Sequence, residues 1–270
     1  MKKYSGLSCL LYSFFIFLMA FACTYFGFLS TINYIATDFL YQKPSNISNQ
    51  IKIIAIDEKT IAKYKTPSNW SRQMYASLVD KLNDYKPDSP SVIAFDIYFD
   101  ERSQNSNGDL IFAKTCEENK NVITASNIIF QPVIKYHSQN TPYIDNLNIS
   151  SVEYPYEELS SAAQSGFVNA LQDADNYIRR SFVSMNYDNS QIFSFPFLTY
   201  KNYMAETGQT PVIPKTDEFN CFMFTYSAEP SSKYEVFSLC DVLDGKYDSS
   251  VFKNCIVLVG AYAAGLQDSH

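Results

Sequence analysis

Hydrophobic and polar positions divide the chain into one long apolar run and a longer part in which apolar and polar stretches alternate. The run from Leu7 to Leu29 contains no charged residue. About 20 apolar residues are enough for a helix to cross the hydrocarbon core of a membrane, so we predict one transmembrane helix over residues 7–30. Lys2 and Lys3 precede it, and the positive-inside rule therefore places the N-terminus in the cytoplasm and the main domain outside, at the cell membrane.

A cleaved signal peptide is the alternative interpretation of this run. Ala20-Phe21-Ala22 fits the small-residue pattern of a cleavage site, and Cys23 next to it resembles a lipoprotein cleavage box. Against cleavage, the apolar run continues to Leu29, beyond the length that a signal peptide needs. The bulky Phe21 also stands where small residues are usual, so the sequence favours an uncleaved anchor.

Strand-like and helix-like stretches alternate after the anchor. Ile51 to Ile56 and Val92 to Phe99 are apolar and rich in β-branched or aromatic residues, as buried strands are. Between them, Met74, Leu78 and Leu82 recur at helical spacing. This order predicts a βαβ unit with parallel strands and a right-handed crossover, and hence an α/β fold with a mostly parallel sheet covered by helices.

The remaining pattern predicts a hairpin insertion and further short elements. Residues 127–154 are polar and contain prolines, which favours a surface excursion or a small hairpin inserted into the sheet. The other expected elements are a helix opening at Asp109, a strand at 122–125, a helix at 157–163, paired strands at 166–169 and 177–183, a helix at 195–204, a strand at 220–226, a helix at 239–243 and a strand at 255–259.

Composition excludes several classes of function. The net charge of −7 gives no electrostatic footprint for nucleic acid, so no nucleic-acid partner is expected. His137 and His270 are the only histidines, and no serine stands in a Gly-x-Ser-x-Gly elbow. The turn from Gly260 to Gly265 lacks the lysine and the Ser or Thr of a phosphate-binding loop. We therefore predict no catalytic residue in this chain, and the sequence specifies no cofactor.

Four of the six cysteines lie outside the apolar run, and none forms a CxxC pair. Two disulfides would be compatible with this number. Scattered cysteines in a domain of this size are also typical of small buried hydrophobic residues, which is the interpretation that we favour. The four are Cys116, Cys221, Cys240 and Cys255.

Three acids follow or end predicted strands and are candidate ligand-binding residues. Asp57 follows the first strand, Asp96 lies near the end of the second, and Asp268 follows the last. Ligands of open α/β sheets bind at the carboxyl ends of strands, so these acids could bind Mg²⁺, Ca²⁺ or a cationic group. Alternatively, Asp57 and Asp268 cap helices or turns, and Asp96 pairs with an arginine.

Two arginines and the single tryptophan complete the candidate set. Arg72 and Arg179 are each expected to capture an anion or to form an internal ion pair, and the ion pair is the simpler role. Trp70 could line a ligand pocket or pack in the core.

An ordered series of motifs resembles the CHASE2 family of extracytoplasmic sensor domains. The resemblance covers residues 51–270, although Trp70 is followed by Ser71 where the family usually has proline. The motifs are Ile-Ala-Ile-Asp57-Glu58, Trp70-Ser-Arg72, Phe-Asp96-Ile-Tyr-Phe99, Gly108-Asp109, Gly166-Phe-Val-Asn169, Asp175 with Arg179-Arg180, Asp241-Val-Leu-Asp-Gly245, and Gly260 to Asp268.

The resemblance implies a receptor in several parts. After a cytoplasmic stub (1–6), the anchor and a juxtamembrane linker (31–50), the sensor domain (51–270) would bind an unknown small molecule, within a homodimer, and relay the signal to a cytoplasmic output module beyond His270. The family's continuation after the last Asp is missing, so we expect the domain to be truncated. The alternatives are a metal-assisted hydrolase built on Asp57, Asp96 and Asp268, and a surface assembly domain that senses nothing.

Overall fold

The computed structural model describes residues 6–25, 28–42, 47–65, 70–104, 106–136, 142–173, 175–226 and 234–263. The chain divides into two compact units. The first unit comprises Met1–Asn46 with Thr225–Ala228, and the second comprises Ile47–Phe224 with Glu229–His270.

The first unit contains the helices α1 (Gly6–Tyr25) and α2 (Phe28–Tyr41). The predicted segment 7–30 thus covers α1 and the first residues of α2, and α2 fills much of the predicted linker. In α2, Ile32, Ile35 and Phe39 share one face by their spacing and are exposed. Among the described residues, no helix combines the length and the apolar character needed to cross a membrane.

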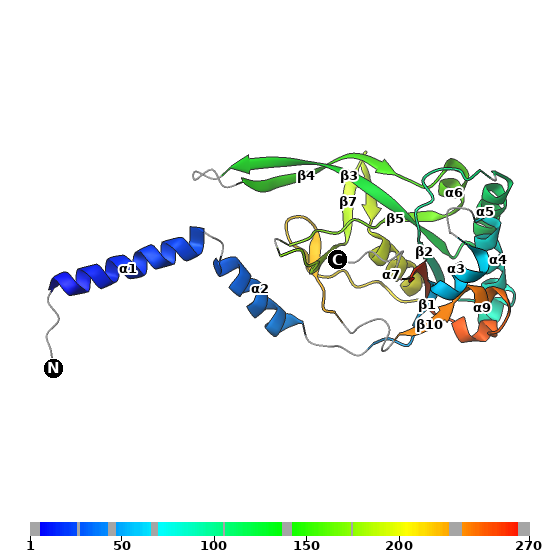
Figure 1. The fold of residues 1–270 in the computed structure, drawn as a ribbon. Helices are drawn as coiled ribbons and strands as arrows, with labels where there is room; N and C mark the ends of the chain where they lie inside the picture. Colours follow the sequence, from blue (N-terminus) through cyan, green and yellow to red (C-terminus); the bar gives the residue numbers. More distant parts are fainter. Residues whose placement is uncertain are drawn as a thin grey trace. The chain divides into compact units, whose positions relative to one another are not determined.

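The second unit is built around one mixed sheet with the strand order β10-β1-β11-β2-β3-β4, and β5 pairs with β3 as well (Figure 1). All of its strand pairs are parallel except β3 with β4. This confirms the predicted α/β fold with a mostly parallel sheet. The strands are β1 (Ile51–Ile56), β2 (Val92–Asp96), β3 (Val122–Tyr136), β4 (Pro142–Glu153), β5 (Gln164–Phe167), β10 (Glu235–Ser238) and β11 (Ile256–Ala261).

The central position belongs to β11, the last strand of the chain. It lies between β1 and β2 and is parallel to both. The predicted βαβ unit therefore exists with its two strands parallel but not adjacent. Local sequence patterns could not reveal this order, because the partner of β1 follows it by about 200 residues.

Helices cover both faces of the sheet. Alternate residues of a strand point to opposite faces: Ile93 and Phe95 pack into one buried cluster, and Val92 and Ala94 pack into another with α7. The helices of this unit are α3 (Glu58–Tyr64), α4 (Gln73–Asn83), α5 (Ser106–Asn119), α6 (Glu157–Ala162), α7 (Phe195–Glu206) and α9 (Leu239–Leu243), with short 3₁₀ turns at Lys86–Asp88 and Ser249–Phe252.

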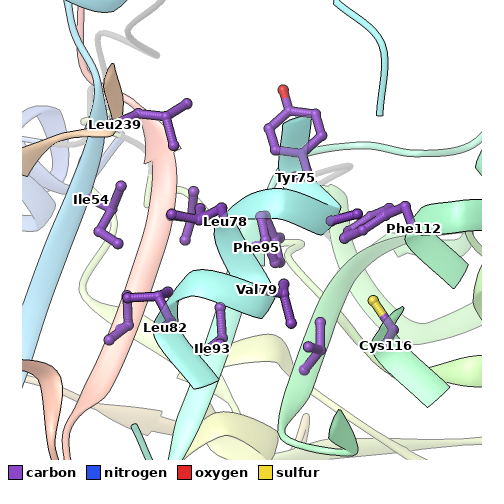
Figure 2. Close-up of a cluster of buried hydrophobic side chains, with 14 of the residues drawn as sticks. Ile54, Tyr75, Leu78, Val79, Leu82, Ile93, Phe95, Phe112, Cys116 and Leu239 are labelled. Carbon is purple, nitrogen blue, oxygen red and sulfur yellow. The ribbon is translucent and has the colours of Figure 1, made fainter. Parts of the chain in front are cut away.

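The larger cluster is packed mainly by α4 and α5 against β1 and β2. Figure 2 shows Leu78, Val79 and Leu82 of α4 directed toward these strands. The ring of Tyr75 lies 5.8 Å from that of Phe95. Such edge-on aromatic pairs contribute roughly 0.5–1.5 kcal/mol each beyond the area that they bury, so this cluster stabilises the packing of α4 on the sheet.

The hairpin insertion predicted at 127–154 is present, and its two strands pair from Asn127 with Glu153 to Tyr136 with Pro142. β3 begins inside the sheet, becomes largely exposed from Ile129 onward, and pairs antiparallel with β4. Register shifts occur between Ile129 and Phe130 and between Val133 and Ile134. These irregularities break the alternation of apolar and polar residues, which is why no strand periodicity is visible in the sequence.

The second predicted hairpin, at 166–169 and 177–183, is wrong. β5 instead adds to β3 in parallel, and β6 (Arg180–Phe182) pairs with β9 (Cys221–Met223). One isolated bridge, between Leu171 and Arg180, connects the two segments. The polar residues between them form a turn that is organised by ion pairs and not by a strand ladder.

A true hairpin follows, formed by β7 (Ser184–Tyr187) and β8 (Ser190–Phe193). Its two turn residues, Asp188 and Asn189, both have positive φ, as the tight hairpin turn requires. Directly after β8, the hydroxyl of Ser194 accepts a hydrogen bond from the backbone N of Phe197 and caps α7, as its position in the sequence predicts.

Candidate functional site

Asp57 follows β1 and caps the short helix α3. Its Oδ1 accepts hydrogen bonds from the backbone N (2.9 Å) and hydroxyl (2.7 Å) of Thr60, and from the hydroxyl of Ser238 (2.8 Å). Burial raises the pKa of Asp57, but these hydrogen bonds together outweigh it, so the pKa of this carboxyl lies below its usual value. Asp57 thus joins the end of β1 to the end of β10, and capping is the role that the structure gives it.

Asp96 is the exposed last residue of β2 and pairs in register with Gly260 of β11. Because β11 separates β1 from β2, Asp57 and Asp96 lie about two strand spacings apart, roughly 10 Å. Asp268 lies outside the described residues. The sheet therefore brings Asp57 and Asp96 to the same edge, on either side of β11.

A metal centre is not assembled at this edge by the residues that the structure describes. Among them, no three His, Cys, Asp or Glu side chains are grouped as metal ligands. A calcium ion takes six to eight oxygen ligands, and Oδ1 of Asp57 already accepts three hydrogen bonds.

Arg72 precedes α4, and aromatic rings enclose its guanidinium group. The guanidinium carbon lies 4.6 Å from the ring centre of Tyr156 and 5.3 Å from that of Phe99. Its Nη1 lies 3.3 Å from Oδ1 of Asp109, and its Nη2 donates to the carbonyl oxygen of Glu101. Arg72 therefore forms an internal ion pair, which is one of the two roles that the sequence predicted for it.

The partner acid, Asp109, was not among the candidate residues. It is buried in the first turn of α5 and also accepts hydrogen bonds from the backbone N (2.8 Å) and hydroxyl (2.9 Å) of Ser103. A Cβ at the preceding Gly108 would lie 2.5 Å from Oγ of Ser71. Gly108 thus permits the close approach of α5 to α4 that brings Asp109 to Arg72.

Trp70 both packs in the core and lines a cavity. Its side chain is buried, and Nε1 donates to the carbonyl oxygens of Tyr64 (2.9 Å) and Lys65 (3.2 Å). The cavity beside it has a volume of about 380 Å³, and Gln73 and Met74 also line it.

Arg179 is buried and lies in a network of ion pairs with acids of the turn that precedes it. Its guanidinium nitrogens lie 3.0 Å from Oδ2 of Asp173 and 2.8 Å from both carboxylate oxygens of Asp175. This pairing lowers the pKa of Asp175. Arg180 contacts Asp173 (3.1 Å) and Asp217 (3.4 Å). The pairs hold the turn before β6 onto the loop before β9, so anion capture is not what the Arg179 side chain does here.

The expected roles of the cysteines are also resolved within the described residues. Cys116, Cys221, Cys240 and Cys255 are buried and free. Burial raises the pKa of the Cys221 thiol to about 12, so this cysteine behaves as a small apolar residue and not as a nucleophile.

Sequence reasoning missed a second cavity, of about 470 Å³, which we call the β5–β8 cavity. It lies between the end of α6, β5, β8 and the start of α7, and none of its described lining residues is charged. Only the run of small and polar residues at 160–165 could have indicated it, and that run matches no motif. Its polar lining residues are Tyr154, Ser160, Ser161, Gln164, Ser165 and Gln191.

Gly166 fixes the boundary of this cavity. A Cβ at this position would lie 2.5 Å from Cα and 2.8 Å from N of Phe195, closer than any side chain tolerates against backbone. Beyond it, Phe167 forms a parallel bridge with Ser194. β5 and the chain entering α7 therefore meet at Gly166, next to the cavity-lining Ser165.

The comparison with protein families adds a decisive observation. The sequence profile of the CHASE2 domain matches residues 14–270. The chain belongs to the CHASE2 family. CHASE2 domains are extracytoplasmic sensor domains of signalling proteins, and the match begins well before residue 51, where the resemblance in the motifs begins. Neither the curated proteins nor the solved structures contain a match to the chain.

The motif positions of this CHASE2 domain have structural roles. Asp57 joins two strands, Asp109 pairs with Arg72, and Gly166 permits a backbone contact. Asp57, Asp109 and Gly166 therefore each contribute to the fold of the domain.

Proposed function

We propose that this chain is the membrane-anchored, extracytoplasmic sensing part of a signal-transduction receptor. The domain binds a small signal molecule and relays a conformational change to a cytoplasmic output module outside this chain. The observation that carries the proposal is the match of the CHASE2 profile to residues 14–270. The chain itself acts as a sensor and not as an enzyme.

The anchor of the proposed receptor is the uncharged run from Leu7 to Leu29. Its length suits a single crossing of the membrane. Lys2 and Lys3 keep the N-terminus in the cytoplasm, so the sheet domain lies on the extracytoplasmic side.

The relay of the proposed receptor starts from the connections between the two units. The first unit includes Thr225–Ala228 from the middle of the sequence, and there the backbone N of Tyr226 donates to Oε1 of Gln42 (2.8 Å). Asn46 leads on to β1, which begins at Ile51, so the anchor has one covalent route to the sheet, through β1. The segment Thr225–Ala228 lies between β9 and β10 in the sequence, and it adds a second, non-covalent route through the hydrogen bond between Tyr226 and Gln42. We place the receptor in a homodimer, in which two anchors can move against each other.

Cysteine labelling on intact bacterial cells tests the topology. Ser190 is exposed at the turn between β7 and β8, whereas the native cysteines of the sheet domain are buried. A membrane-impermeant maleimide is expected to label Ser190→Cys on intact cells and to label Ser5→Cys only after permeabilisation. Labelling of Ser190→Cys only after permeabilisation would refute the proposed orientation.

Thermal unfolding of the full chain in lipid nanodiscs tests the sensing. A ligand that binds only the folded state stabilises it by about 2.7 kcal/mol at 100 times its dissociation constant. A sensor is therefore expected to show a raised melting temperature with at least one compound of a small-molecule panel. If no compound of the panel shifts the melting temperature, an assembly domain is the better description.

A further inference from the structure

The β5–β8 cavity combines neutral polar groups with an aromatic ring. Three serine hydroxyls, two glutamine amides and the hydroxyl of Tyr154 line it. The Tyr154 side chain is 43% exposed, so its ring is accessible from the cavity. A volume near 470 Å³ lies in the range of small-molecule sites.

The polar groups of the cavity retain capacity for hydrogen bonds. Gln164 accepts from Asn202 through Oε1 (3.2 Å), and Gln191 donates to Ser184 through Nε2 (2.9 Å). Within the described part of the chain, these bonds occupy one polar atom of each amide. Nε2 of Gln164 is left as a donor and Oε1 of Gln191 as an acceptor. Hydroxyls such as that of Ser161 can do both, so the lining matches a ligand whose groups donate and accept alike.

The β5–β8 cavity differs from an adjoining cavity in the charge of its lining residues. Ser161 and Ala162 also line the adjoining cavity, which carries Lys114, Glu117 and Glu157. Burying a charged ligand group without an opposite charge is strongly unfavourable, and the described lining of the β5–β8 cavity offers none. A charged ligand is therefore disfavoured there, and a neutral one is not.

We propose that the β5–β8 cavity binds a neutral, hydroxyl-rich ligand with one or two sugar rings, that is, a small carbohydrate. The hydroxyls of such a ligand pair with the serines and glutamines, and the apolar face of a pyranose ring packs on the ring of Tyr154. That this carbohydrate is the signal of the receptor rests on the proposed sensor function. That the cavity binds a carbohydrate does not depend on the sensor function.

Calorimetry on the full chain in phosphatidylcholine nanodiscs, without sugar-based detergent, tests the proposal. The neutral probes are cellobiose and N,N′-diacetylchitobiose, and the charged probes are cationic chitobiose and anionic cellobiouronic acid. At least one neutral probe is expected to bind with a dissociation constant below about 1 mM, equivalent to about 4 kcal/mol. The charged disaccharides are expected to bind at least about tenfold more weakly.

Variants locate the binding in the cavity. Gln164→Ala combined with Gln191→Ala is expected to weaken the neutral probe about tenfold, the effect of one or two lost hydrogen bonds. Ser161→Trp fills the cavity and is expected to abolish binding. The matched control is Gln73→Ala, an exposed glutamine that lines the cavity beside Trp70, and it is expected to leave the affinity unchanged.

Three results would overturn the proposal: no heat from either neutral probe at about 10 mM, equal or tighter binding of a charged probe, or equal weakening by Gln73→Ala. The melting temperature of each variant shows that it is folded. If the neutral disaccharides fail while Ser190→Cys is labelled outside and another compound stabilises the domain, the carbohydrate assignment falls and the sensor function stands.

Discussion

Charged and neutral polar side chains occupy different kinds of place in this domain. The charged candidates, Arg72 and Arg179, are enclosed and paired with acids of the same domain. In the β5–β8 cavity, by contrast, Gln164 and Gln191 are exposed, and each uses one polar atom of its amide among the described residues. The difference teaches that these two arginines are engaged within the fold, whereas the cavity glutamines keep polar atoms that could bond a ligand.

The largest expected loss in free energy of unfolding comes from removing the acid that pairs with Arg72. Asp109→Asn leaves a guanidinium whose side chain is only 12% exposed without its counter-charge. Breaking a buried pair from one side costs about 3 kcal/mol in free energy of unfolding. Urea unfolding followed by fluorescence of Trp70, the single tryptophan, measures the change. The control is Asp84→Asn, at an exposed acid after α4, which is expected to stay within about 0.5 kcal/mol. Equal losses in both variants would show that the pair does not stabilise the fold.

The second largest loss of stability is expected at Gly166, where two backbone segments meet beside the cavity. Gly166→Ala forces apart β5 and the start of α7, since its Cβ meets backbone atoms of Phe195. Overpacking of this kind costs about 2 kcal/mol. Gly260→Ala is the matched control in β11, because its Cβ would lie at ordinary contact distance, 3.5 Å from Cβ of Asp96. Thermal unfolding by circular dichroism distinguishes the two, and a Gly166→Ala variant as stable as Gly260→Ala would contradict the close approach.

Acid titration tests whether Asp57 acts as a structural charge. Its folded pKa lies below the usual value, so its contribution to stability is present above about pH 4 and is lost as the pH falls through the folded pKa. We expect Asp57→Asn to be less stable than the natural chain by about 1 kcal/mol at pH 6, because hydrogen bonds to a charged acceptor are stronger than those to a neutral amide, and the difference to shrink below about pH 4. Urea midpoints between pH 6 and pH 3 measure it. The control is Asp100→Asn, at an exposed acid. If the stability difference between Asp57→Asn and the natural chain is the same at every pH, the charge of Asp57 does not stabilise the fold.

The cavity glutamines give the smallest expected effect on folding. Both side chains are exposed, and substitutions at such positions usually change the free energy of unfolding by less than about 0.5 kcal/mol. Gln164→Ala and Gln191→Ala are therefore expected to unfold like the natural chain in urea. A loss above about 1 kcal/mol would mean that the cavity residues, like the charged clusters, serve mainly to support the fold.

The elements of the sheet domain followed closely from local patterns. The β-branched runs became β1 and β2, the apolar spacing of Leu78 and Leu82 became α4, and Ser194 caps α7. What local patterns could not supply was the pairing. β11 enters between β1 and β2 from the far end of the chain, and β5 joins β3 instead of the segment that follows it, because strand partners are chosen by packing over long distances in sequence.

The candidate site was predictable only in part. The position of Asp57 at a strand end was foreseeable, and so was an ion pair at Arg72, but its partner Asp109 depends on how α5 approaches α4. The β5–β8 cavity was not predictable, because its lining comes from elements that are separated in the sequence and because serine and glutamine carry no distinctive pattern.

The pairing of β1, the first strand after the anchor, with β10 has a mechanical consequence. These strands are parallel neighbours, and Lys52 pairs with Glu235 both in register and by an ion pair. A parallel register cannot slide by one residue without turning side chains to the wrong face. A force that displaces β1 along its axis is therefore resisted as shear against β10, so the two strands are held to move together.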